Sequence, residues 1–106
     1  MRVLFDQGTP IPLRLALTQH DVSTAFEQNW STPKNGELLD AAEFVGFDVL
    51  VTTDMNLRYH QNLTGRRIAI VVLSTPSWPR MQHAIDNIVN AVNVAAPASY
   101  SEITIG

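Results

Sequence analysis

The sequence predicts an α/β protein, in which helices cover both faces of a mainly parallel central sheet to give a three-layer α/β/α arrangement. Residues 47–53 and 68–73 form apolar runs rich in Val and Ile that do not alternate with polar residues. Such runs are typical of strands buried on both faces of a parallel sheet. Segments with helical periodicity separate the runs, and this alternation of strands with helices favours parallel pairing.

The length and composition predict one domain over residues 1–106. A chain of 106 residues is the size of a single hydrophobic core. Its 45% hydrophobic and 16% charged content is ordinary for a packed globular protein. No apolar run is long enough to cross a bilayer, and Asp6 interrupts the start before a signal-peptide core could form. We therefore expect a cytoplasmic protein that does not bind membranes.

Charge and residue usage narrow the chemistry. The net charge of −3 argues against a broad cationic face that holds nucleic acid, although it permits a transient RNA substrate. The absence of cysteine excludes disulfides, thiolate zinc sites and cysteine nucleophiles. His20, His60 and His83 are far apart and share no ligand spacing, so we expect them at the surface or the edge of the core.

The first third of the chain reads as strand, turn, short helix and weak strand. Gly8, Pro10 and Pro12 punctuate the chain after the first apolar run. The expected elements are a strand at residues 2–5, a short helix at 13–17, a strand at 22–26 and a polar loop at 28–36.

The remaining chain predicts three helices and three strands. Gly46 is placed to end a helix over residues 37–45, and Ser77 can cap a later helix with Pro79 in its first turn. Strands are expected at 47–53 and at 68–73, the second at or near the centre of the sheet. A short helix at 57–63, a long helix with a buried stripe over 81–92, and an edge strand containing Ile103 and Ile105 complete the set.

Two acidic residues stand at the ends of strands. Asp6 follows the first apolar run and Asp54 follows the run at residues 47–53. In a parallel sheet the functional crevice lies beyond the carboxyl ends of the strands, so the two carboxylates should face one crevice. The alternative is that each aspartate only caps the helix that follows it.

Glu37 is a third candidate. A helical wheel at 3.6 residues per turn places it within the apolar arc, while Asp40 and Glu43 fall outside. The arc comprises Phe44, Ala41, Val45, Leu38, Ala42 and Leu39. A buried carboxylate needs a partner, and a metal ion shared with other acids is one. Alternatively, Glu37 complements the helix dipole beside a cap at Asn35. Oxygen ligands without cysteine or clustered histidine indicate Mg²⁺ or Mn²⁺.

Several segments resemble a known family. They are Val-Leu-Phe-Asp at residues 3–6, Asn-Gly-Glu-Leu-Leu at 35–39, the run over 46–54 and Asn-Leu-Arg-Tyr at 56–59. Together they are similar to the small bacterial PIN-like proteins classed as predicted toxin nucleases. The likeness covers most of the chain and is strongest over residues 34–73.

The resemblance implies a PIN-like fold and a metal-dependent ribonuclease, the toxin of a toxin–antitoxin pair. Acids from the first strand, a middle helix and a later strand would meet at one Mg²⁺ or Mn²⁺ site, and Asp6, Glu37 and Asp54 match these positions. Asn56 stands where many PIN domains have a fourth acid and is counted with the metal ligands. The implied partners are RNA and an antitoxin protein, with a homodimer as an open alternative.

The sequence also departs from that family. Gln7 and Gly8 follow the first aspartate where relatives commonly have a second acid and Asn. Fewer acids weaken metal binding, because affinity follows ligand charge and number. An alternative is therefore a catalytically weak or inactive PIN-like module that binds a protein partner.

A receiver-like phosphorylation domain is a rival from another class. Asp54 would accept the phosphoryl group, but that family has two adjacent acids after its first strand and a lysine after its last. Here Asp6 is followed by Gln7, and Lys34 is the only lysine.

Arginine and tryptophan side chains offer weaker signals. Arg58, Arg66 and Arg67 could steer a phosphate backbone, although loop arginines are more often solvated. Trp30 and Trp78 could stack on a base, although packing at the edge of the sheet is the more common use.

Overall fold

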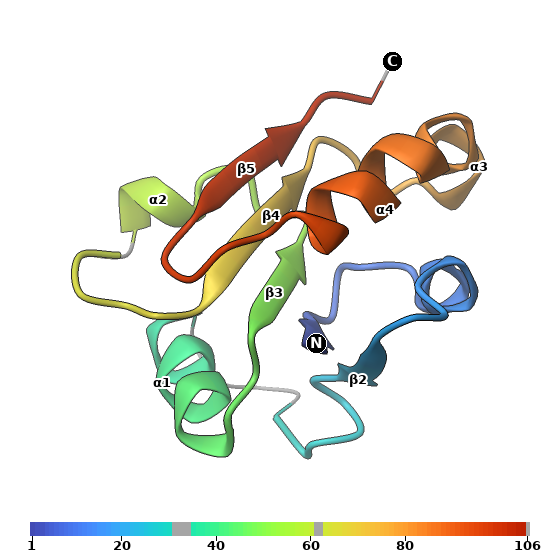
Figure 1. Cartoon of the computed structure of the whole chain (residues 1–106). Coiled ribbons are helices and arrows are strands. Elements are labelled where there is room, and N and C mark those ends of the chain that lie inside the picture. The colour runs from blue at the N-terminus through green and yellow to red at the C-terminus, as the bar shows by residue number, and fades with distance from the viewer. Residues whose placement is uncertain (31–34, 61–62, 106) are drawn as a thin grey trace.

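A computed structural model of the chain describes residues 1–30, 35–60 and 63–105. Strands and helical segments alternate along it (Figure 1). The elements are β1 (Arg2–Phe5), η1 (Ile11–Ala16), β2 (Asp21–Thr24), α1 (Asn35–Val45), β3 (Val49–Thr52), α2 (Leu57–His60), β4 (Ala69–Leu73), α3 (Trp78–Met81), η2 (Gln82–Ala84), α4 (Ile85–Asn93) and β5 (Tyr100–Ile103).

The five strands form one sheet in the order β2-β1-β3-β4-β5, and every neighbouring pair is parallel. The predicted parallel sheet is therefore confirmed. β3 is the central strand, with Val51 opposite Phe5 on one side and Val71 on the other. β4 lies next to the centre and β5 at an edge, as expected. All residues of β3 and β4 are buried, which explains their continuous apolar sequences.

Helical segments cover both faces of the sheet. Successive side chains of a strand point to opposite faces, so each strand contributes to two separate cores. One core joins the strands to η1, α3, η2 and α4, and the other joins them to α1 and α2 (Figure 1). Phe5, Val51 and Met81 belong to the first core, and Leu4 and Leu50 to the second.

Two predicted elements end or break earlier than expected. β2 stops at Thr24, because the Glu27 carboxylate accepts a hydrogen bond from the Thr24 backbone N–H and starts a turn. The helix predicted over residues 81–92 consists of α3, η2 and α4. The 3-10 turn η2 has about three residues per turn, which keeps Met81 and Ala84 on the buried side. Ser77 caps α3 as predicted, accepting from the Arg80 N–H.

The helix predicted over residues 37–45 ends where expected, but α1 begins two residues earlier, at Asn35, and its predicted orientation was wrong. Gly46 ends it with φ +97°, and the N–H of Gly46 donates to the Ala42 carbonyl. Leu38, Leu39 and Ala42 pack on the sheet, whereas Phe44 is 92% exposed. The buried arc of α1 is therefore narrower than the apolar arc of the helical wheel. No helix within the described ranges is long and apolar enough to cross a membrane.

Candidate active site at the ends of β1 and β3

The order of strands reverses between β1 and β3. From β1 the chain moves outward to β2, then returns across β1 to β3 and continues to β4 and β5. In doubly wound sheets of this order, ligands bind in the crevice beyond the carboxyl ends of the strands at this switch point. Asp6 directly follows β1 and Asp54 lies two residues after β3. The prediction that these acids follow neighbouring parallel strands is confirmed.

Two threonine hydroxyls fix the carboxylate of Asp6. Thr9 Oγ1 lies 2.7 Å from Asp6 Oδ1, and Thr52 Oγ1 donates to Asp6 Oδ2. Both threonines are buried, whereas Asp6 is half-buried. The Asp6 carboxylate is thus oriented at the sheet edge while part of it remains open to solvent. The sequence analysis missed both threonines, although Thr52 lies two residues after the buried Leu50 and so points to the same face of the sheet.

Thr52 also links the two aspartates. Its hydroxyl donates to Asp6 and accepts a hydrogen bond from the Asp54 backbone N–H at 3.0 Å. Asp54 Oδ1 in turn accepts from the Asn56 N–H at 3.0 Å, and the Asp54 carbonyl accepts from the Leu57 N–H at the start of α2. Asp54 therefore forms a local turn at the start of the following helix, as in the alternative in which it only caps that helix. This hydrogen bond is made by Asp54 Oδ1 at the switch point.

Gly8 lets the loop after β1 approach the end of β3. A Cβ atom on Gly8 would lie 2.6 Å from Thr53 Oγ1, closer than real Cβ atoms come to other atoms. The glycine at position 8 therefore has a packing reason. A larger residue at Gly8 would move Thr53, which directly precedes Asp54.

Glu37 is exposed, so the prediction that its side chain faces the core was wrong. It lies in the first turn of α1, on the face of the sheet that carries Leu4. The last turn of α1 is next to the start of β1, because Arg2 Nη1 donates to the Val45 carbonyl. Glu37 therefore belongs to the helix on the predicted face of the sheet, but its side chain is exposed to solvent.

Carboxylates are suitable ligands for a hard metal ion, but few of them are grouped at this site. Within residues 1–30, 35–60 and 63–105, no three acidic or histidine side chains are grouped so that they could hold a metal. Asp6 and Asp54 have carboxylate oxygens suited to such an ion, while Glu37 and Asn56 are exposed to solvent. Mg²⁺ often takes only one or two carboxylates and keeps several waters. Asp6 and Asp54 are the residues that would hold such an ion.

Glu43 of α1 holds the helix to the segment before β4. Glu43 Oε1 lies 2.7 Å from Arg66 Nη1, and Glu43 Oε2 accepts from the Arg67 backbone N–H at 2.7 Å. Burial raises the pKa of Glu43, but these hydrogen bonds and the Arg66 charge lower it more, so the pKa lies below its ordinary value. Arg66 also pairs with Asp40 at 2.9 Å. Arg66 thus ties α1 to the turn before β4.

Most of the other arginine, tryptophan and histidine side chains considered from the sequence contact neighbouring side chains. Arg58 stacks on Tyr59 and Tyr100 and pairs with Glu102 at 3.5 Å. Trp30 packs edge-on against Phe47 with ring centres 6.2 Å apart, and Trp78 packs against the core on the other face. The ring of His20 is bonded to the Met1 ammonium group and to Asn93, and His83 is exposed. Lys34 and the side chain of His60 lie outside the described parts of the chain.

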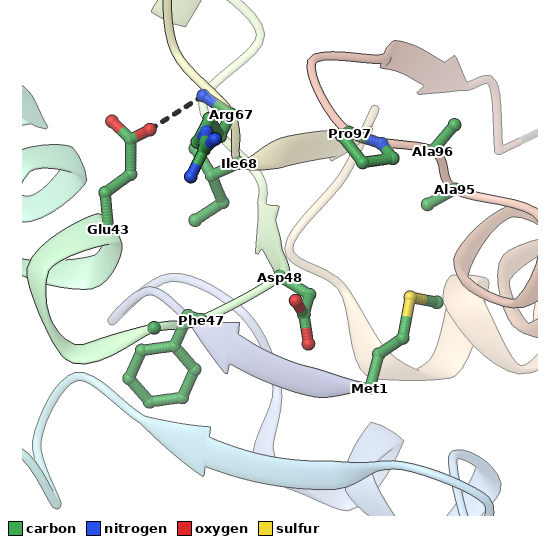
Figure 2. Close-up of a pocket in the computed structure, with 10 residues that line it drawn as sticks. Met1, Glu43, Phe47, Asp48, Arg67, Ile68, Ala95, Ala96 and Pro97 are labelled. Carbon is green, nitrogen blue, oxygen red and sulfur yellow. Dashed lines mark hydrogen bonds between the residues drawn. The ribbon is translucent and has the colours of Figure 1, made fainter.

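A hollow of about 420 Å³ lies at the amino-terminal ends of β1, β3 and β4, opposite to the ends that carry Asp6 and Asp54 (Figure 2). Its walls include Phe47, Ile68 and Pro97, and Asp48 and Glu43 contribute carboxylates. Each carboxylate is bonded to a backbone N–H, Asp48 to that of Arg2 and Glu43 to that of Arg67. The length of β3 separates this hollow from the switch point, so it is not part of the predicted site.

A second hollow of about 390 Å³ adjoins the switch point. It is lined by Asp6, Gln7, Thr9, Ile11, Thr24 and Phe26. The carboxylate predicted to be catalytic is thus part of the wall of a concave surface. Its size is within the usual range for small-molecule sites.

Comparison with protein-family models, curated proteins and solved structures finds no match. The geometry is therefore the basis for a function. The strand order is shared with receiver domains, in which Asp54 would be the phosphoryl acceptor. Residues 1–30, 35–60 and 63–105 contain no lysine to pair with a phosphoryl group, and Gln7 replaces the second acid.

Proposed function

We propose that this protein is a metal-dependent ribonuclease of the PIN-like type that hydrolyses phosphodiester bonds in RNA. The observation that carries the proposal is the position of Asp6 and Asp54 at the β1/β3 switch point, joined through the Thr52 hydroxyl. In the cytoplasm it would act as the toxin of a toxin–antitoxin pair, with RNA as a transient substrate and an antitoxin protein as partner.

The chain's own residues orient the reacting groups. Thr9 and Thr52 hold the Asp6 carboxylate in one direction, and Thr52 also positions the backbone of Asp54. Such supporting hydrogen bonds keep ligating carboxylates in place. Asp6 and Asp54 would hold an Mg²⁺ or Mn²⁺ ion, which would lower the pKa of a water molecule and stabilise charge on the scissile phosphate. No side chain is then needed as a nucleophile, which suits a site made of two carboxylates and two hydroxyls.

The test is cleavage of single-stranded RNA by purified wild-type protein, Asp54→Asn and Asp48→Asn. Asp48 is the matched control because it is an acid at the other end of β3. We expect wild type and Asp48→Asn to cleave only with Mg²⁺ or Mn²⁺, and Asp54→Asn to lose at least about 100-fold in rate, a typical loss for a key electrostatic group. Cleavage that persists in EDTA, or that Asp54→Asn retains, contradicts the proposal.

The second candidate function is a catalytically inactive PIN-like module that binds a protein, either an antitoxin or a second copy of the chain. Two observations favour it: the described residues group no three acids for a metal, and Phe44 and Leu15 are exposed. Thermal unfolding with and without Mn²⁺ separates the candidates, because an ion that binds the folded state raises the melting temperature. A melting temperature independent of Mn²⁺ favours the binding module.

A further inference from the structure

The hollow beside Asp6 has an exposed apolar rim. Phe26 is 75% exposed and Ile11 is 61% exposed, and both line the hollow. They come from two separate segments, the turn after β2 and the helix η1. A hydrophobic side chain in water contributes nothing to folding, so this pair at the mouth of a concave surface indicates a binding role.

The turn that carries Phe26 is fixed by hydrogen bonds on both sides. The Glu27 carboxylate accepts from the Thr24 N–H at 2.9 Å and pairs with Arg14 of η1. The Glu27 N–H donates to Thr24 Oγ1 at 3.1 Å, and the Ala25 N–H donates to the Phe5 carbonyl at 2.8 Å. Phe26 is therefore presented by a held turn, which lowers the entropy that binding must overcome.

Among the described residues, the remaining lining is polar and contains no cationic side chain. Thr9 and Thr24 are buried, Gln7 is exposed, and its side-chain amide has no hydrogen-bond partner among the described residues. Arg14, the nearby cation, is already paired with Glu27. With Asp6 in the wall, this surface is unsuited to a bare phosphate. A flat, neutral, partly apolar group with hydrogen-bonding edges fits better.

We propose that the hollow receives a nucleobase of single-stranded RNA, stacked on Phe26 with Ile11 at its side, while the Gln7 amide bonds to the edge of the base. Aromatic stacking is one of the ways in which proteins hold unpaired bases, and its contribution does not come from charge. This inference rests on the proposed ribonuclease function. Phe26 then positions RNA beside Asp6 and adds binding energy that does not depend on cationic residues.

The experiment is fluorescence anisotropy with a labelled single-stranded RNA hexamer in EDTA at low salt, where no metal-dependent cleavage occurs. Phe26→Ala should weaken binding at least about fivefold, the lower end for loss of one stacked base. Phe26→Trp should bind as wild type or more tightly. The matched control is Phe44→Ala, since Phe44 is exposed on α1 and does not line the hollow. A duplex of the same sequence should bind more weakly, because its bases are already stacked.

Several results would overturn the inference. They are wild-type affinity in Phe26→Ala, an equal loss in Phe44→Ala, duplex binding as tight as single-strand binding, and no binding of the hexamer by 1 mM protein (about the weakest specific affinity). Dissociation of a wild-type dimer by Phe26→Ala, seen in sedimentation, would assign the rim to a protein contact instead.

The inference and the ribonuclease proposal can fail separately. RNA binding that depends on Phe26, without any Mn²⁺-dependent cleavage, supports base stacking on Phe26 and contradicts the ribonuclease proposal. Cleavage that depends on Asp54 but has the same KM in Phe26→Ala supports the ribonuclease proposal and contradicts base stacking on Phe26. If both hold, Phe26→Ala should raise KM at least about fivefold with kcat within about twofold, because stacking away from the scissile bond binds substrate and transition state equally.

Discussion

Removing the carboxylate of Asp6 should reveal its coupling to Thr52. In Asp6→Ala, the buried Thr52 hydroxyl loses its acceptor, whereas the Thr9 hydroxyl keeps the Val51 carbonyl at 3.0 Å. A buried donor without a partner costs about 1–3 kcal/mol, so we expect the free energy of unfolding to fall by about 2 kcal/mol. Thr52→Val, which removes the hydroxyl and nearly keeps the shape, should cost about 1.5 kcal/mol.

The double variant should be about as unstable as Asp6→Ala alone, which gives a coupling energy of about 1.5 kcal/mol between the two side chains. Urea unfolding measures it, and a loss of 2 kcal/mol lowers the midpoint by about 1–2 M at an unchanged slope for a small domain. Losses that simply add, with a coupling below about 0.5 kcal/mol, would refute the hydrogen bond as the reason for the position of Asp6.

Two further predictions concern the supports of the site. The lowered pKa of Glu43 contributes stability above the ordinary pKa of 4.5, and this stability is lost as the pH falls through the folded-state pKa. Glu43→Gln should therefore show a smaller loss of urea midpoint than wild type between pH 6 and pH 3.5, and an equal loss contradicts the assignment. Gly8→Ala should destabilise the protein by about 1 kcal/mol by forcing Thr53 from its rotamer. Thr53→Ala in the same chain should restore most of that loss in thermal unfolding, and a loss that stays would place the clash elsewhere.

Strand positions and strand-end acids could be predicted from the sequence because burial on both faces leaves a local signal. β3 and β4 are buried at every residue, so their sequences show no polar alternation. Acids follow β1 and β3, and they mark the end of the sheet where the strands terminate. Asp6 and Asp54 were therefore placed at neighbouring strand ends without knowledge of the fold. The strand order, which makes this edge a switch point, depends on long-range pairing and had no local signal.

The orientation of α1 could not be predicted, because a wheel shows which residues are apolar and not which of them the sheet covers. Leu38, Leu39 and Ala42 fill the space above the sheet, and Phe44 remains in water. The buried arc is thereby narrowed and Glu37 is exposed. The sequence predicts that Phe26 ends a weak strand over residues 22–26, whereas the hydrogen bonds of Glu27 place it in a turn.

The most direct test of the account is a crystal of the wild-type protein soaked in Mn²⁺ and measured at a wavelength where manganese scatters anomalously. The account predicts an anomalous peak at the β1/β3 switch point with the carboxylates of Asp6 and Asp54 as its protein ligands, at the distances of about 2 Å typical of such ions. A fully soaked crystal with no peak there, or with its only peak at Glu43 and Asp48 on the opposite edge, would contradict it.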